Sequence, residues 1–358
     1  MINTDCHLQT NAMIKIRFPS PLTKDCWAIE EPSQKSLTAV PFIVVLMSVA
    51  CVKPIAKSSL FEFLLSKVNF KVEQLEKILK ELFTKNIITF VEVGDIPLVN
   101  NFLNWTKFGW GEAANYHFST WDASFLDYSK EGGGHDFERK LMAEYQKLEP
   151  DTSRFKIHEG SQDRIELPDL GSLSAFDLQK ESSVLTRIKY LLSFAFGKKG
   201  EKSCHWNDTP LIKRTSPSGG SRHPTEGYFF PVGLQEMKKG FYHVQTEPTS
   251  LSLLSGEKED FLAKFNIEND PQLPVCGAII LTTVFERNMY RYREPRTFRT
   301  IHMDIGHILE TLELLGKEFS LKTRIHLSFN EDAILQQIGA SKLDEGVMAV
   351  VTLHEEKN

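Results

Sequence analysis

The sequence predicts a protein of the α+β class with a helical module ahead of it. Apolar residues at helical spacing predict amphipathic helices at Ser182–Phe196 and Thr300–Phe319. β-Branched and apolar runs predict strands at Gly227–Val232, Gly277–Val284 and Val347–Leu353, the second of them buried on both faces. Helices and strands mixed within one half of a chain are typical of a layered core in which helices cover a sheet.

Length and composition indicate two folded parts of an ordinary globular protein. The chain has 358 residues, 41% hydrophobic and 25% charged, with a net charge of -5. A broad basic surface for nucleic acid is therefore not favoured. Residues 1–100 are expected to form an N-terminal module, residues 101–150 an aromatic-rich connector, and residues 151–358 the main domain.

The cysteines and the N-terminus favour a cytoplasmic protein. Five cysteines lie scattered with no CxxC pair, which argues against a disulfide framework and against a zinc site. The histidines show no metalloenzyme spacing, so no metal is expected. The N-terminus lacks a signal-peptide core, and the longest apolar run, Ala39–Val52, contains Pro41 and is too short to cross a bilayer.

The N-terminal module follows a helix-helix-helix-strand pattern. A buried helix is expected at Phe42–Cys51, a short one at Ser58–Leu65 with Ser58 or Ser59 as its N-cap, and a third around Val72–Leu82. The strand Ile87–Val91 follows. This order is the outline of a winged helix, and a generic helical packing module is the alternative.

The segment Lys213–Pro231, KRTSPSGGSRHPTEGYFFP, is a candidate ligand loop. Its paired glycines allow an irregular backbone that approaches a ligand closely, and successive amides in such a turn can form an anion-binding nest. Arg214, Arg222 and His223 add positive or titratable groups beside it. A solvated connecting loop would explain the same composition.

A second basic segment precedes the last long helix. Arg287, Arg291, Arg293, Arg296 and Arg299 alternate there with aromatic residues. Arginines bind phosphate bidentately and aromatic rings stack on planar ligands, so the segment is a candidate cofactor surface. The alternative is a solvated basic face.

Together these segments resemble a known family. PSGGxxHPxE, a tyrosine- and arginine-rich stretch and DxGHxxxxLxLxG are similar to the SagB-type dehydrogenases of thiazole- and oxazole-peptide maturation, in the FMN-dependent nitroreductase superfamily. The upstream phrase with Trp105, Trp110 and Tyr116-His117 is similar to what precedes that core. The resemblance implies an α+β sandwich with a central antiparallel-type sheet and flanking helices, and a homodimer that binds FMN at its interface.

The resemblance also implies cofactor-binding positions. The loop Ser216–Ser221 matches the segment that lies along the flavin, and Ser153-Arg154 is the nearest match to an Arg/Ser phosphate anchor, although the family's neighbouring arginines are missing. Arg299 matches an arginine ahead of the long helix, within which Gly306 is expected to be a packing position. The cofactor-binding candidates are Ser153, Arg154, Ser216, Pro217, Ser218, Gly219, Gly220, Ser221 and Arg299.

The catalytic candidates depart from the family pattern. Related dehydrogenases often carry a Lys-Tyr pair in the basic segment, where this sequence has Arg291-Tyr292. Because arginine stays protonated, the resemblance assigns proton removal to Tyr292, with Arg291 favouring the phenolate through its positive charge and Tyr290 as the substitute.

The function implied is FMN-dependent oxidation of azoline rings to azoles in a ribosomally made peptide. The implied partners are the precursor peptide, bound by the N-terminal module, and a cyclodehydratase complex, with no nucleic acid and no membrane. The alternatives are an NAD(P)H-dependent nitro- or quinone reductase and a non-catalytic scaffold of a peptide-modifying complex.

Overall fold

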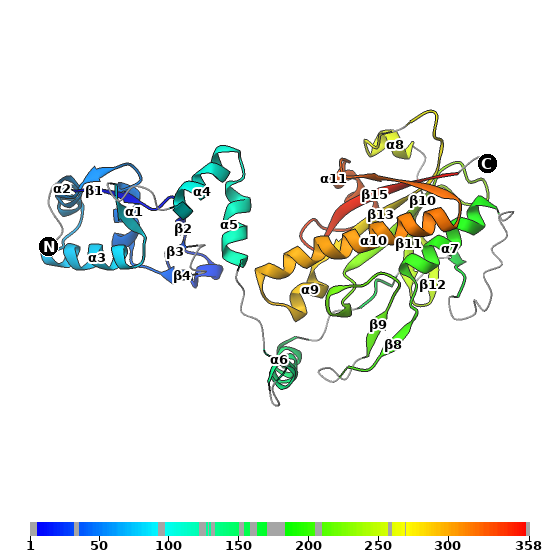
Figure 1. Ribbon diagram of the computed structural model, residues 1–358, viewed down its shortest axis with the longest axis horizontal. Helices are drawn as coiled ribbons and strands as arrows, with labels where there is room; N and C mark the ends of the chain where they lie inside the picture. Colours follow the sequence, from blue (N-terminus) through cyan, green and yellow to red (C-terminus); the bar gives the residue numbers. More distant parts are fainter. Residues whose placement is uncertain are drawn as a thin grey trace. The chain divides into compact units, whose positions relative to one another are not determined.

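The computed structural model describes residues 6–31, 36–91, 97–121, 127, 129, 133–149, 154–157, 163–169, 183–204, 210–256, 260–268 and 270–355. Contacts divide the chain into two units, Met1–Ser124 and Phe125–Asn358 (Figure 1). This boundary lies inside the segment 101–150 that the sequence predicted as a connector. Helices α4 (Pro97–Lys107) and α5 (Gly111–Thr120) lie in the first unit, and α6 (Gly134–Leu148) lies in the second.

The first unit contains the three predicted helices and the strand that follows them. These are α1 (Phe42–Ala50), α2 (Lys57–Lys67), α3 (Val72–Thr84) and β6 (Ile88–Phe90). The predicted serine cap of the second helix is wrong, because α2 begins at Lys57 after Ala56, without a side-chain cap. Two antiparallel sheets complete the unit. The first has the order β5 (Ile55–Ala56), β1 (His7–Thr10), β6; the second has the order β2 (Lys15–Arg17), β3 (Ala28–Glu31), β4 (Ser36–Ala39).

The second unit is built on a seven-stranded sheet whose neighbouring strands are all antiparallel. This confirms the predicted mixed α/β class and the antiparallel-type central sheet. The strand order is β14 (Leu321–His326), β15 (Glu345–Glu355), β13 (Val275–Val284), β10 (Thr225–Pro231), β11 (Gly240–Thr246), β12 (Thr249–Gly256), β7 (Arg164–Glu166). A two-stranded ribbon, β8 (Gly200–Lys202) and β9 (Leu211–Lys213), leads into β10.

Helices cover both faces of this sheet. Alternate strand residues point to opposite sides, and apolar side chains on both sides pack against helices. Phe229 of β10 packs with α7 (Val184–Phe196) and α10 (Phe298–Glu318), whereas Phe230 packs with α8 (Phe261–Lys264) and α11 (Glu331–Ile338). Figure 1 shows α7 and α10 lying across one face. The central strand β13 is buried on both faces, as its apolar run predicted.

A serine caps the start of helix α7 and a glycine follows its end. The Ser183 side chain accepts a hydrogen bond from the Thr186 amide, and Gly197 follows the last turn. Among the described residues, no helix is long and apolar enough to cross a membrane. All five cysteines are free thiols.

Candidate functional site

The loop that leads into β10 is fixed to the long helix α10. The Ser218 hydroxyl donates to the Asp304 carboxylate at 2.7 Å, and the Gly219 amide donates to the other carboxylate oxygen at 3.1 Å. Two turns farther along the helix, the Ser216 hydroxyl donates to the Thr311 hydroxyl at 2.7 Å. The two motifs that carried the family resemblance are therefore in direct contact.

Asp304 is the anchor of this contact. Its side chain is 3% exposed. Burial raises the pKa of the Asp304 carboxyl above its usual value, and the hydrogen bonds from Ser218 and Gly219 oppose that rise. Asp304 therefore holds the loop in place, and the loop in turn supplies hydrogen bonds to both oxygens of this buried carboxylate.

Gly220 brings the predicted cofactor loop against the predicted catalytic tyrosine. Its φ is +60°, in the left-handed region that favours glycine. A Cβ on Gly220 would lie 2.1 Å from the Tyr292 hydroxyl oxygen, so no other residue fits without moving that ring. The loop and Tyr292, more than seventy positions apart in the sequence, form one site.

The predicted anion nest is not formed by most amides of this loop. The Gly219 amide donates to Asp304, and the Ser221 and Arg222 amides donate to the Ser218 and Gly219 carbonyls. The His223 amide donates to the Ser218 hydroxyl at 2.9 Å. These amides satisfy the turn itself, because a short 3₁₀ turn (Gly219–Ser221) closes here.

Arg287 and Arg222, from the two candidate ligand segments, are part of the protein interior. Arg287 pairs with Glu226 and donates to the His223 carbonyl at 3.0 Å, and Arg222 donates to the Arg287 carbonyl at 2.7 Å. Glu226 is also 2.8 Å from the His243 ring. Although burial raises the pKa of Glu226, Arg287 and His243 more than offset that effect and hold it well below its usual value. Arg287 and Arg222 therefore order the loop's base.

Arg214 and His223 show how strongly this region is buried. Burial, helped by the nearby Arg287 charge, lowers the pKa of Arg214 to about 10. Burial and the Arg214 charge lower the pKa of His223 to about 3, so its ring is neutral near pH 7. The His223 Nε2 atom lies 3.0 Å from the Ile212 carbonyl, which can only accept, so Nε2 carries the proton.

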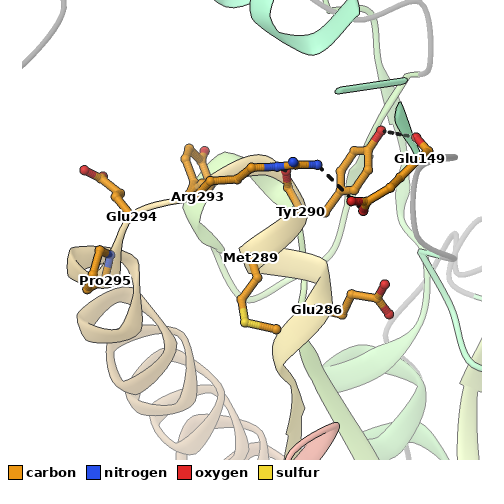
Figure 2. A pocket seen from close by; sticks show the side chains of 8 residues that line it. Glu149, Glu286, Met289, Tyr290, Arg293, Glu294 and Pro295 are labelled. Atoms are coloured by element: carbon orange, nitrogen blue, oxygen red, sulfur yellow. Dashed lines mark hydrogen bonds and ion pairs between the residues drawn. The ribbon is translucent and has the colours of Figure 1, made fainter. Parts of the chain in front are cut away.

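Tyr292 borders an open cavity of about 510 Å³ (Figure 2). Helix α9 (Phe285–Arg291) ends immediately before it. The Arg291 guanidinium lies 5.2 Å from the Tyr292 ring centroid, so the predicted pair is adjacent in space as well as in sequence. The cavity is lined by Glu149, Glu286, Met289, Tyr290, Tyr292, Arg293, Glu294 and Pro295.

The predicted phosphate anchor, Ser153-Arg154, is described only at Arg154. Ser153 lies outside the described residues, and the Arg154 guanidinium donates to the Pro210 carbonyl. Arg299 is half-buried and precedes Thr300, whose Cβ lies 3.8 Å from the position of a Cβ on Gly219. Arg299 thus directly precedes a residue that lies beside the loop. Gly306 is exposed and has open space around it, so the predicted packing role is wrong.

These residues fit a planar, anionic cofactor of the FMN type beside the loop. Ser218 to Ser221 are partly exposed, and the paired glycines present no side chain to a flat ring system. Three buried guanidiniums, of Arg214, Arg222 and Arg287, lie at the base of the loop with one buried carboxylate, Glu226, and this excess of positive charge favours an anionic ligand beside the loop.

A second cavity, of about 820 Å³, lies in the first unit. Its lining contains three of the chain's five tryptophans and no acidic, lysine or arginine side chain. The Trp105 and His117 rings stack at 5.6 Å and 11°, while Trp110 meets Trp105 edge-on. Trp105, Trp110 and His117 were part of the family resemblance, but the sequence did not predict a cavity here. The lining residues are Asn101, Asn104, Trp105, Phe108, Trp110, His117, Phe118 and Trp121.

Comparison with solved structures finds weak likenesses. A putative nitroreductase from Anabaena variabilis is 22% identical with a TM-score of 0.48, covering 67% of this chain, which spans 45% of that longer protein. A chain of the E. coli microcin synthetase McbBCD complex is 16% identical with a TM-score of 0.41, covering 66% of this chain and 86% of that one.

Sequence comparison finds a nearer relative. No protein-family model matches the chain. The trifolitoxin-processing protein TfxB of Rhizobium leguminosarum bv. trifolii is 27% identical over 276 residues, which is 69% of this chain and 71% of that protein. The resemblance predicted from the two core motifs is thereby confirmed: this chain resembles the SagB-like branch of the nitroreductase superfamily.

Proposed function

We infer that the chain is an FMN-dependent dehydrogenase that oxidises azoline rings to azoles in a ribosomally made peptide. The observation that carries this proposal is the contact between Gly220 and the Tyr292 hydroxyl, at the edge of an open cavity. It unites a glycine loop suited to a flat cofactor with a group suited to take a proton. The similarity to a toxin-processing protein supports a peptide as the substrate.

The reaction removes two hydrogens from the azoline ring. Tyr292 takes one as a proton from a ring carbon, with the Arg291 guanidinium 5.2 Å from the centroid of its ring. FMN, when bound, supplies the two-electron acceptor for the other, which leaves as a hydride. The aromatic azole is the product, and oxygen or another acceptor restores the oxidised cofactor.

The chain's own residues orient these parts. Asp304 and Thr311 fix the loop on α10, so the glycines present a rigid backbone. Arg299 and the loop residues would hold FMN, with Ser153 and Arg154 as proposed contributors to its phosphate site. The cavity beside Tyr292 would receive the substrate ring.

We also propose that the first unit recognises the precursor peptide. Its helix-helix-helix-strand order is compatible with the winged helix proposed from the sequence. The uncharged aromatic cavity of this unit favours the role, because tryptophan-rich cavities recognise apolar side chains and their asparagines can bind backbone amides. A homodimer and a partner cyclodehydratase are part of the same proposal.

The decisive experiment is the visible absorption spectrum of the purified protein, with the released cofactor identified. A yellow protein that releases FMN and converts an azoline peptide to an azole peptide, losing two mass units, supports the proposal. Light scattering of the same sample measures whether it is a dimer.

Two other outcomes would replace the proposal. Rapid flavin reduction by NAD(P)H without azoline oxidation would identify a nitro- or quinone reductase. A colourless protein that does not bind added FMN would identify a scaffold of a peptide-modifying complex.

A further inference from the structure

Helix α6, which lies in the segment predicted as a connector, contacts the part of the chain that carries Tyr292. Glu138 of α6 lies 2.9 Å from Arg291. The Tyr290 hydroxyl donates to the Glu149 carbonyl at 3.2 Å, just beyond the end of the helix. Figure 2 shows Glu149 close to both Tyr290 and Arg293, whose guanidinium lies 3.7 Å from the Glu149 carboxylate. Tyr290, Arg291 and Arg293 are therefore each engaged by Glu138 of α6 or by Glu149 immediately after it.

The Glu138–Arg291 pair is largely removed from water. The exposed fraction is 15% for the Glu138 side chain and 5% for Arg291. A buried guanidinium is strongly disfavoured unless a carboxylate compensates it, so Glu138 stabilises both the place and the charge of Arg291. Surface ion pairs would give no such constraint.

Arg291 links Glu138 to Tyr292. Its guanidinium lies 5.2 Å from the Tyr292 ring, and the Tyr292 hydroxyl is seated against Gly220. The Tyr292 ring thus lies between a cation fixed by Glu138 and a backbone fixed by Asp304. Moving the cation changes both the ring's position and the field at its hydroxyl.

We propose that Glu138 is a positioning residue of the Tyr292 site, acting through Arg291. Glu138 does not touch the substrate cavity, because its partner lies between it and Tyr292. This assignment rests on the proposed function for its catalytic meaning. The coupling of Glu138 to Tyr292 through Arg291 can be measured without turnover.

The kinetic test compares Glu138→Gln, Glu138→Asp and the matched control Glu144→Gln, an exposed glutamate on the same helix. In FMN-loaded protein, Glu138→Gln is expected to lower kcat about tenfold with KM within about twofold, because small misplacements of a reacting group are costly. Glu138→Asp should recover part of the loss, and Glu144→Gln should leave kcat unchanged. An unchanged kcat in Glu138→Gln, or no recovery in Glu138→Asp, would overturn the proposal.

A spectroscopic test separates this inference from the proposed reaction. 3-Fluorotyrosine placed at position 292 reports its surroundings through its fluorine NMR shift, whether or not the protein oxidises azolines. The shift should change in Glu138→Gln, stay in Glu144→Gln, and show no further change when Glu138→Gln is added to Arg291→Gln. An additional change in that double variant would show that Glu138 does not act through Arg291. If the single variant unfolds, Glu138→Asp carries the same comparison.

Discussion

The interiors of the two units differ in what they bury. In the described part of the first unit, the core is apolar, and Glu31 and Lys57 are its buried charged side chains. The second unit buries many more, among them Arg214, Glu226 and Arg287 around a single loop. Because buried charge is expensive and an apolar core would be at least as stable, this concentration favours the second unit as the place of the proposed chemistry.

The largest expected effect tests the chemistry assigned to the second unit. Tyr292→Phe removes the hydroxyl that lies against Gly220 and should lower kcat for azoline oxidation by about 100-fold or more, the usual contribution of a general base. FMN content should remain that of the wild type, because the phenyl ring still fills the same place. Single-turnover kinetics on an FMN-loaded sample measure the loss. Full activity would move the base elsewhere and remove the main argument for this cavity.

The next effect is on stability and tests the burial around the loop. The pKa of His223 is lowered to about 3, whereas the unfolded chain protonates this ring near its ordinary value. A depressed pKa adds stability above the unfolded value, and that stability is lost as pH falls toward the folded one. Between pH 7.5 and 5 the His223 contribution should fall by about 2 kcal/mol.

Urea unfolding at several pH values measures that loss. The control is His223→Gln, whose amide can still donate to Ile212 but does not titrate. Its free energy of unfolding should depend less on pH over this range than that of the wild type. Equal slopes for the two proteins would mean that His223 is accessible to protons and that the loop's base is less buried than the structure has it.

A third and smaller effect separates close approach from backbone strain. Gly220→Ala and Gly233→Ala both place alanine at a positive φ, +60° and +69°, but only at Gly220 does the new methyl meet Tyr292. Both variants should lose about 1 kcal/mol to backbone strain, and Gly220→Ala should lose more because its methyl group also meets Tyr292. Only Gly220→Ala should also lower kcat, by about tenfold, since it displaces the tyrosine. Equal kcat values for the two variants would show that the close approach of Gly220 to Tyr292 does not affect the reaction.

Local sequence signals predicted the strongly periodic helices and strands, but not every regular element and not the assembly of the site. Helix α10 and strand β13 were predicted because their periodicity is local and strong. Strand β11 was missed because it buries His243, Gln245 and Thr246, which give it no apolar alternation. Helix α6 was missed because its first turn follows glycines that also suit a loop.

The site shows the same limit in three dimensions. The loop and Tyr292 were each found from motifs, but their contact depends on how α9 and α10 pack. Glu138 lies 153 positions from Arg291, and no local pattern links the two. Arg287 and Arg222 show a related limit, since composition cannot distinguish a basic surface from guanidiniums that are buried against a carboxylate or a carbonyl.

The smallest expected effect tests the recognition role of the first unit. Trp121→Leu removes an indole from the uncharged cavity, whereas Trp27→Leu removes one that packs on Phe18 and Phe42 outside it. Trp121→Leu should weaken precursor-peptide binding about fivefold, or about 1 kcal/mol, with turnover of a short azoline peptide unchanged. Isothermal calorimetry and parallel kinetics separate the two. If both variants bind the precursor as tightly as the wild type, recognition does not depend on this cavity. If turnover of the short peptide falls together with precursor binding, the proposal that the first unit serves only in recognition is wrong.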